Sequence, residues 1–279
     1  MGVFRYTGRT FARELMLIAL AAIWWVPFYF LVVVSLKPSD EVTAHPFGFP
    51  ADLAFDNYNS AWAGDASVSL GSALVSSLVI TVGSVAGLIV IGSLCAYAIA
   101  RREGRLSTGL YLLFVLGIIV PFQLGIIPVY VALRELNLGG TYPGMIILYI
   151  GLMMPLAVFM YTGFIQQLPR DYEEAAFVDG ASRVRTFVRV VFPLLGPVTA
   201  TVAVLASVII WNDFFVQLIF LSGNTRETLP VVIYSFVGQY VSQWNLIFAA
   251  VVVTIAPVLV FYLVAQRQLI RGFSGGIKT

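Results

Sequence analysis

The stretch from Tyr172 to Pro197, YEEAAFVDGASRVRTFVRVVFPLLGP, is the longest arginine-rich polar interruption between two strongly apolar segments of this chain. Acidic side chains stand where a first short helix should begin, and there they complement the positive end of its dipole: Asp171, Glu173 and Glu174. Gly180 stands where that helix should stop, because glycine readily takes the left-handed conformation found just after a helix C-terminus.

A second short helix is predicted directly after this glycine. Ser182 is a typical N-cap residue, and three arginines follow it at Arg183, Arg185 and Arg189. Ala175 and Ala176 are small, so another surface could approach the first helix closely. A helix, a glycine turn and a helix between two membrane spans have the shape of a docking element in the cytoplasm, although the spacing alone also fits a solvated helical hairpin.

The spacing of this segment resembles the EAA loop in the permease subunits of bacterial ABC importers. It runs Glu174-Ala175-Ala176, three residues, Gly180, nine residues, then Val190-x-Phe192-Pro193. The family prefers Ile and Leu where this chain has Val190 and Phe192, which are apolar exchanges. Asp179-Gly180-Ala181, together with Pro193 and Pro197, is similar to the carbohydrate-importer branch, which includes the maltose-type inner-membrane permease.

The resemblance implies that residues 170–197 form a coupling loop against a cytoplasmic ATPase. The residues carried over to that role are Glu173, Glu174, Ala175, Ala176, Asp179, Gly180, Ala181 and Pro193. It implies four further partners, namely a second permease subunit in a heterodimer, two ATP-binding subunits and an extracytoplasmic solute-binding protein. ATP and Mg would then belong to the partner ATPases, and this chain would be a non-catalytic subunit without a cofactor.

Composition independently predicts an integral membrane protein. The 279 residues are 59% hydrophobic and 11% charged, with a mean hydropathy of +0.92, whereas a soluble domain carries about 25% charged residues. Cys95 is the single cysteine and His45 the single histidine. We interpret Cys95 as a packing residue and His45 as a loop residue, because neither has a partner of its own kind for a disulfide or a metal site.

Six apolar runs predict an all-α protein with six membrane-spanning helices, each long enough for a hydrocarbon core of about 30 Å. They cover Leu15–Leu36, Ala66–Ala100, Leu106–Leu133, about Thr141–Gln166, Val198–Leu221 and Leu246–Ala265. The basic start followed by an apolar run also suggests a signal peptide. The first run is long and no small-residue cleavage site follows it, which favours a retained span.

Residues inside these runs predict local features. Pro121 and Pro128 should kink or break the third span, and Thr141 is a plausible N-cap of the fourth. Gly83 and Gly87 form a GxxxG pattern, which either lets two helix backbones approach closely or arises by chance. Residues 37–65 form an acidic external loop with three prolines.

The positive charges predict the orientation. Thirteen of the 16 Lys and Arg residues fall in segments that six spans would place on the side of both termini. The other three are Lys37, Arg134 and Arg226. By the positive-inside rule, the N-terminal segment 1–14 and the tail 267–279 are cytoplasmic. The resemblance implies that they flank a permease domain over 15–266 in a bacterial inner membrane.

No site for catalysis or nucleotides is apparent in the sequence. The nearest approach to a P-loop, from Gly272 to Thr279, has Ile277 where the last glycine belongs. His45 has no nucleophile nearby in sequence, and zinc-type spacings are absent. The arginines are spread over the turns that flank the membrane, which argues against nucleic-acid binding.

One polar cluster inside a span is the candidate for contact with cargo. Trp211, Asn212, Asp213 and Phe214 combine aromatic faces with an amide and a carboxylate, a set that suits a sugar. The WNDFF sequence is similar to a motif of carbohydrate-importer permeases. Because ionisable groups are costly in lipid, Asp213 either lines the translocation pathway or bonds structurally near the external interface.

Two other transport functions remain open from the sequence. An ion-coupled secondary carrier usually has paired halves and ionisable residues near the midplane, and here only Asp213 fits. An ABC permease for glycerol phosphate or a similar solute would need a cationic site, and no Lys or Arg lies in any predicted span. A non-transporting scaffold would leave the spacing of the coupling loop unexplained.

Overall fold

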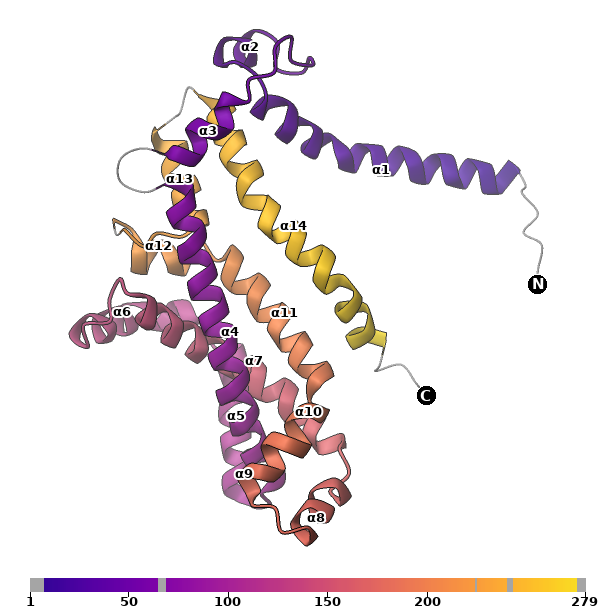
Figure 1. The fold of residues 1–279 in the computed structure, drawn as a ribbon, viewed down its shortest axis with the longest axis vertical. Helices are drawn as coiled ribbons and strands as arrows, with labels where there is room; N and C mark the ends of the chain where they lie inside the picture. Colours follow the sequence, from indigo (N-terminus) through magenta and orange to yellow (C-terminus); the bar gives the residue numbers. More distant parts are fainter. Residues whose placement is uncertain (1–7, 65–68, 224, 240–242, 275–279) are drawn as a thin grey trace. The chain divides into compact units, whose positions relative to one another are not determined.

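A computed structural model describes residues 8–64, 69–223, 225–239 and 243–274, and within those ranges the chain forms helices and turns without any strand (Figure 1). The predicted all-α fold is therefore confirmed. The beginning of the predicted N-terminal segment, the start of the second span at Ala66 and residues 275–279 of the predicted tail lie outside the described residues.

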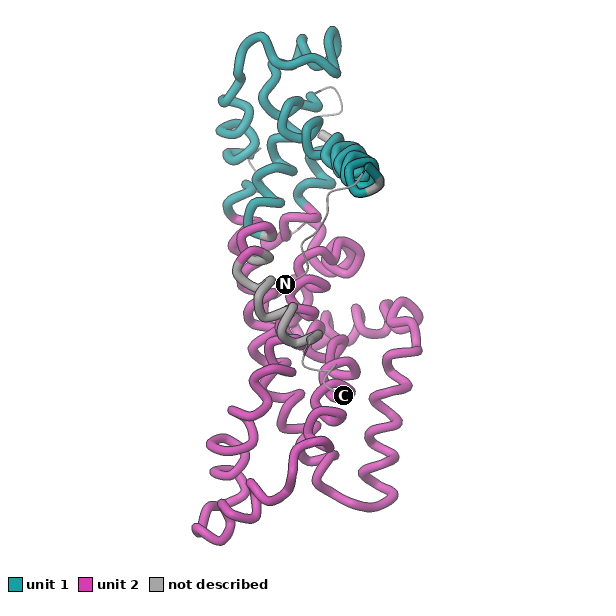
Figure 2. Tube along the Cα trace, turned by 90° about the vertical axis from the view of Figure 1, so that its right-hand side faces the viewer, with its two compact units in different colours: residues 1–71, 232–258 teal, residues 72–231, 259–279 magenta. Residues whose placement is uncertain are grey.

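The chain forms two compact units, residues 1–71 with 232–258 and residues 72–231 with 259–279 (Figure 2). Three helices belong to the first unit: α1 (Gly8–Ser35), α2 (Ser39–Ala44) and α3 (Asp56–Ala63). Three helices have residues in both units: α4 (Leu70–Arg101), α13 (Leu229–Gln239) and α14 (Trp244–Ser274).

The predicted external loop of the first unit is more ordered than its composition suggests, because α2 and α3 form within it. Asn57 on α3 donates hydrogen bonds to the carbonyl oxygens of Ser35 (2.9 Å), the last residue of α1, and of Lys37 (2.8 Å), two residues later. These carbonyls have no partner inside the helix, so the amide satisfies them. Lys37 is itself fully buried, and its ammonium donates to the carbonyls of His45 and Pro46.

The second unit begins within α4 (Leu70–Arg101), the longest helix among the described residues. The elements that follow α4 are α5 (Arg105–Ile119), the 3-10 turn η1 (Phe122–Gly125), α6 (Ile126–Glu135) and α7 (Tyr142–Gln167), then α8 (Asp171–Val178), α9 (Arg183–Thr186), the π-helical turn η2 (Phe187–Val191), α10 (Phe192–Leu194), α11 (Gly196–Asn212) and α12 (Phe215–Leu221).

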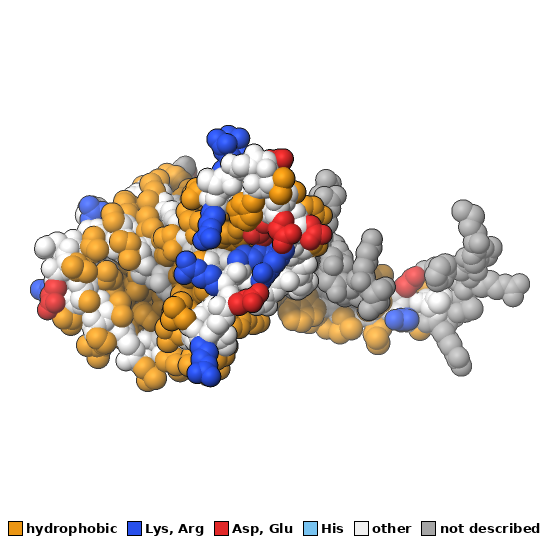
Figure 3. Space-filling model, turned by 90° about the horizontal axis from the view of Figure 1, so that it is seen from below, with side chains coloured by type: hydrophobic (Ala, Val, Ile, Leu, Met, Phe, Trp, Pro, Cys, Tyr) orange, Lys and Arg blue, Asp and Glu red, His pale blue; other side chains and the backbone are white. Residues whose placement is uncertain are grey.

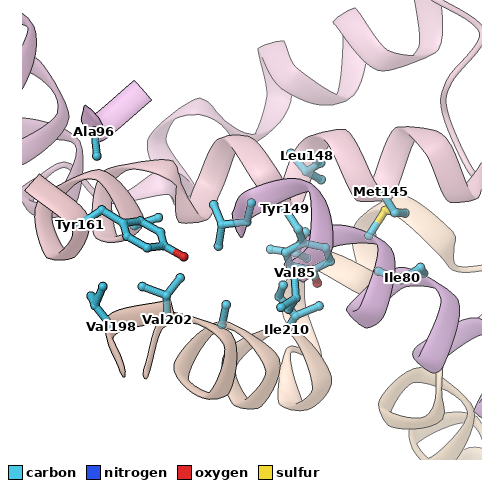
Figure 4. Packing of buried hydrophobic residues seen from close by; sticks show 14 of the residues in the cluster. Ile80, Val85, Ala96, Met145, Leu148, Tyr149, Tyr161, Val198, Val202 and Ile210 are labelled. Atoms are coloured by element: carbon cyan, nitrogen blue, oxygen red, sulfur yellow. The ribbon is translucent and has the colours of Figure 1, made fainter. Parts of the chain in front are cut away.

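The core of this unit lies where α4, α7 and α11 meet. Figure 4 shows Val85, Tyr149 and Ile210 from these three helices converging in it.

Gly83 and Gly87 form a true packing seam between α4 and α7. A Cβ atom at Gly83 would lie 2.6 Å from Ile146 Cδ1, and one at Gly87 would lie 2.4 Å from Ile150 Cδ1. Both distances are shorter than carbon atoms tolerate, so the isoleucines of α7 fill the space that the missing side chains leave. The GxxxG pattern thus has a structural basis within a single chain.

The third predicted span is broken, as its prolines suggested, but only one of them causes the break. Helix α5 ends at Ile119, Pro121 has an extended backbone, and the axes of the two flanking helical segments differ by 96°. Pro128 lies in the first turn of α6, where a missing N–H costs nothing. The predicted break within Leu106–Leu133 is therefore confirmed, at Pro121.

The fifth predicted span, Val198–Leu221, is interrupted as well. Helix α11 ends at Asn212, Asp213 leaves the helical conformation with φ −70° and ψ 114°, and α12 begins at Phe215. Among the described residues, three helices are each long and apolar enough to cross a membrane. The total reaches five if each of two bent pairs, α5 with η1–α6 and α9–α10 with α11, forms one span. The sixth predicted span lies in α14, and the count of six remains a prediction.

Gly144, in the first turn of α7, provides a test of this packing. A Cβ atom there would lie 2.1 Å from the backbone oxygen of Leu138, which cannot move without the turn that precedes the helix. We expect Gly144→Ala to lower the free energy of unfolding by at least about 1–3 kcal/mol, measured by thermal unfolding in detergent. Gly151→Ala, on the same helix with nothing within 4 Å, is the matched control. Equal stability of the two variants would contradict this packing.

Candidate functional site

The predicted docking element is a hairpin of α8 and α9 joined by a tight glycine turn. Gly180 has φ +78°, a left-handed conformation that glycine adopts without strain. The N–H of Ala181 donates to the Ala176 carbonyl at 2.9 Å, and that of Gly180 donates to the Phe177 carbonyl at 3.0 Å. This pair of bonds is a Schellman motif. It fixes the direction in which the chain leaves α8.

The second helix of the hairpin starts as predicted and then continues in a wider turn. Ser182 accepts a hydrogen bond from the Arg185 N–H through its hydroxyl at 3.4 Å, so it caps α9. Arg183 and Arg185 lie on α9, whereas Arg189 lies in η2, the π-helical turn that follows. Such turns are uncommon and insert one extra residue, which reorients the side chains beyond them.

Glu173 anchors the hairpin to the end of α4. Its two carboxylate oxygens accept bonds from Arg101 Nε at 2.7 Å and from the Tyr97 hydroxyl at 2.7 Å. The side chains of Arg101 and Glu173 are only 13% and 9% exposed. Arg101 also donates to the Leu168 carbonyl at 3.1 Å, at the end of α7. One buried carboxylate therefore ties α8 to α4, and its arginine partner ties α4 to α7.

A second ion pair at this end of the molecule is solvent-exposed. Arg170 Nη2 lies 3.1 Å from Glu103 Oε1, and the two side chains are 52% and 85% exposed. Exposed pairs of this kind contribute about 0–1 kcal/mol. The Arg101–Glu173 pair is thus the stronger attachment of the hairpin.

The remaining predicted coupling residues differ in exposure. Glu174, Ala175, Asp179, Gly180 and Pro193 are exposed, whereas Ala176 and Ala181 are half-buried. Glu173 is the exception, since it is buried and fully engaged within this chain. The exposed surface of the hairpin therefore centres on Glu174 and the glycine turn, whereas Glu173 attaches the hairpin to α4. Figure 3 views the chain from the end that carries α8 and α9, where basic and acidic side chains gather.

The predicted pathway cluster surrounds the break between α11 and α12. Asp213 Oδ2 accepts a hydrogen bond from the Tyr149 hydroxyl at 3.0 Å, and Oδ1 accepts one from the Val216 N–H at 3.1 Å. The carboxylate thereby caps the first turn of α12 and holds it against α7. Both oxygens of Asp213 serve the fold, which favours the structural alternative for this residue over direct contact with cargo.

The neighbours of Asp213 are disposed differently. Asn212 is exposed, and its amide donates to the Val208 carbonyl of its own helix at 2.8 Å. Trp211 and Phe214 are half-buried. The structure thus keeps the four residues of the motif adjacent, with Asn212 the most accessible. Their contact with a transported solute remains a prediction.

A buried polar group next to this break fixes it further. Gln217 on α12 donates to the Ile210 carbonyl of α11 at 2.7 Å and accepts a bond from the Thr228 hydroxyl. Ser77 on α4 accepts the Leu229 N–H at 3.0 Å. Carbonyls freed by a helix break inside a membrane must find partners, and Gln217 supplies one for Ile210.

The Tyr149–Asp213 bond can be tested by a double-mutant cycle. We expect Tyr149→Phe and Asp213→Ala each to lower stability, with a coupling energy of about 0.5–3 kcal/mol, because the two side chains share one partly buried hydrogen bond. Thermal unfolding of both single variants and the double variant measures it, and Asn212→Ala serves as the exposed neighbour. Strictly additive effects would show that the bond contributes nothing.

Sequence reasoning missed the residues that hold the candidate site in place. Tyr97 lies in an apolar run, and Arg101 looked like a topology marker beside Arg102 and Arg105. Tyr149 and Gln217 are single polar residues inside predicted spans. A polar group in an apolar span is the signal that could have pointed to the last two, because such groups need partners.

Comparison with known proteins identifies relatives along most of the chain. The profile of the family described as "Binding-protein-dependent transport system inner membrane component" matches residues 88–275. The chain is 35% identical over 259 residues, 93% of each chain, to the probable starch degradation products transport system permease protein AmyC of Thermoanaerobacterium thermosulfurigenes. It is 35% identical over 253 residues, 90% of each chain, to the melibiose/raffinose/stachyose import permease protein MelC of Bacillus subtilis (strain 168).

A solved structure shares the fold. It is a chain from the crystal structure of a bacterial ABC transporter involved in the import of the acidic polysaccharide alginate. The TM-score is 0.78 at 21% identity, and the alignment covers 96% of this chain and 99% of the other.

Proposed function

Because this chain belongs to the family of binding-protein-dependent transport system inner membrane components, we propose that it is a transmembrane subunit of an ATP-driven sugar importer. It is a multi-pass membrane protein, and it forms half of the translocation pathway. Its own residues transmit motion and line the pathway. In this proposal, ATP hydrolysis belongs to the partner subunits.

The observation that carries the proposal is the hairpin of α8 and α9. A glycine turn fixes the angle between the two helices, the buried Glu173 attaches the hairpin to α4, and Glu174 stays exposed at its surface. An element that is rigidly anchored on one side and accessible on the other suits a mechanical connection to a cytoplasmic partner. The family membership identifies the class of machine in which such a connection is needed.

The proposed cycle assigns the remaining steps to partners. Two ATP-binding subunits bind ATP and Mg and close on each other, and the hairpin passes that closure through Glu173 and Arg101 to α4. This chain and a second permease subunit then open outward and accept sugar from an extracytoplasmic solute-binding protein. Hydrolysis resets the assembly, and residues 170–197 act throughout as the coupling loop.

The distribution of Lys and Arg along the chain supports both the proposed orientation in the membrane and the proposed class of cargo. Both termini and the hairpin lie in the cytoplasm of a bacterial inner membrane, with segments 1–14 and 267–279 flanking the permease domain. A neutral oligosaccharide is the proposed cargo, because the predicted spans carry no Lys or Arg to bind an anion. The names of AmyC and MelC, which concern starch products and melibiose, raffinose and stachyose, support this class.

The experiment that tests the proposal is purification of the tagged full-length chain from its host in mild detergent, followed by mass spectrometry and reconstitution. We expect a second permease, an ATPase and a solute-binding protein to co-purify, and labelled oligosaccharide uptake to require ATP. Uptake by the chain alone, driven by an ion gradient without ATP, would overturn the proposal in favour of a secondary carrier. ATP-dependent uptake of glycerol phosphate instead of sugar would overturn the cargo class only.

A further inference from the structure

Two hollows meet at the end of α4, within the second unit. One, with a volume of about 440 Å³, is lined by charged groups from α4, α8 and α9 and the turns beside them: Arg101, Arg102, Arg170, Arg183, Glu173 and Glu174. The other, of about 470 Å³, is an apolar groove between α4 and the segment from α9 to α10. Tyr97, Ala98 and Arg183 line both, so the two are continuous.

The charged hollow is lined by more arginines than carboxylates. Arg101 is paired with Glu173, and Arg170 is paired with Glu103. Within the part of the chain that the structure describes, no carboxylate lies within ion-pair distance of Arg102 or Arg183. Glu174 is the one remaining carboxylate on this lining. Two guanidinium groups against one carboxylate leave room for an added anion, and guanidinium binds phosphate well.

The groove has apolar side chains that nothing covers among the described residues. Leu94 is 46% exposed, Val184 is 74% exposed and Val188 is 55% exposed. Leu94 lies on α4, Val184 on α9 and Val188 in η2. Apolar surface in this position is stabilised by a hydrocarbon chain.

We propose that this continuous site binds an anionic phospholipid. The headgroup phosphate lies between Arg102 and Arg183, and one acyl chain follows the groove past Leu94 and Val188. Basic pockets at the cytoplasmic ends of membrane helices bind acidic headgroups. A soluble anion would leave the groove unused, and an apolar partner helix would leave the arginines unused, whereas a lipid fits both. Because α8 and α9 form walls of the site together with α4, the bound lipid stabilises the position of the hairpin against α4.

The test is native mass spectrometry of the full-length chain, with any subunits that co-purify, after delipidation and titration with defined lipids. We expect phosphatidylglycerol to bind at least about tenfold more tightly than phosphatidylcholine, and Arg102→Gln combined with Arg183→Gln to remove that preference. Arg185→Gln, on the same short helix but outside both linings, should leave it intact. Val188→Asp should weaken phosphatidylglycerol binding, whereas Val178→Asp, an exposed apolar position on α8, should not.

Four outcomes would overturn the proposal. They are equal affinity for the two lipids, equal loss in the Arg185→Gln control, displacement of phosphatidylglycerol by millimolar inorganic phosphate, and undiminished binding in Val188→Asp. Displacement by phosphate would indicate a site for a soluble anion. Loss of ATPase co-purification in the double variant, without any lipid preference in the parent chain, would assign the arginines to an acidic segment of that subunit.

Discussion

Glu173→Gln is expected to reduce sugar uptake at least about tenfold while the ATPase subunits still co-purify. The amide keeps the size of the side chain but removes the charge that Arg101 faces at 2.7 Å, and both side chains are largely buried. Removing one partner of a buried pair leaves the other charge uncompensated, which is strongly destabilising at that point. The hairpin would then still dock through its exposed surface, but its movement would no longer reach α4.

The measurement is ATP-driven uptake of labelled oligosaccharide in proteoliposomes, with ATP hydrolysis recorded in parallel. Arg170→Gln is the matched control, because it breaks an exposed pair at the same end of the molecule and should change uptake less than about twofold. Combining Arg101→Gln with Glu173→Gln should restore part of the lost uptake, since neither side chain then carries an unpaired charge. Unchanged coupling in Glu173→Gln would show that the hairpin transmits force by another route.

Gly180→Val is expected to abolish most transport and to weaken association with the ATPase. At φ +78° a β-branched residue is strained, by about 1–3 kcal/mol. No atom lies within 4 Å of a Cβ built at this position. The effect is therefore conformational rather than steric, and the turn relieves the strain by changing the angle between α8 and α9.

The comparison that isolates this effect is Gly180→Asn, because asparagine accepts the left-handed conformation far better than valine. In Gly180→Asn, uptake and co-purification of the ATPase should stay near those of the parent chain. In Gly180→Val, uptake should fall at least about tenfold. If Val is tolerated, the turn has no mechanical role. If Asn is as harmful as Val, the glycine is needed because a partner contacts it closely, and its backbone angle is secondary.

Local signals were sufficient to predict several features of this chain. Thr141 caps α7 through a 3.1 Å bond from the Gly144 N–H, Gly180 ends the α8 turn, and Pro121 breaks the third apolar run. Each depends on the backbone preference of one residue and its immediate neighbours. That is why a single sequence contains enough information for them.

Features that depend on distant contacts could not be predicted in this way. The break at Asp213 is stabilised by Tyr149, 64 positions earlier, and the burial of Lys37 depends on how the following loop folds back over it. Glu173 and Glu174 are adjacent in the sequence, and the position of α4 decides which of the two is buried. No helix was predicted for the 11 residues of α13, which lie between the fifth and the sixth predicted span.

The length of α4 has a consequence for the membrane itself. Its 32 residues correspond to about 48 Å at 1.5 Å per residue, whereas a hydrocarbon core measures about 30 Å. The surplus gives the helix tolerance to hydrophobic mismatch, since tilting or projecting further accommodates bilayers of different thickness at a modest cost per ångström. A bacterium that remodels its acyl-chain length with temperature can therefore keep Arg101 outside the hydrocarbon, and keep the hairpin attached, without altering this protein.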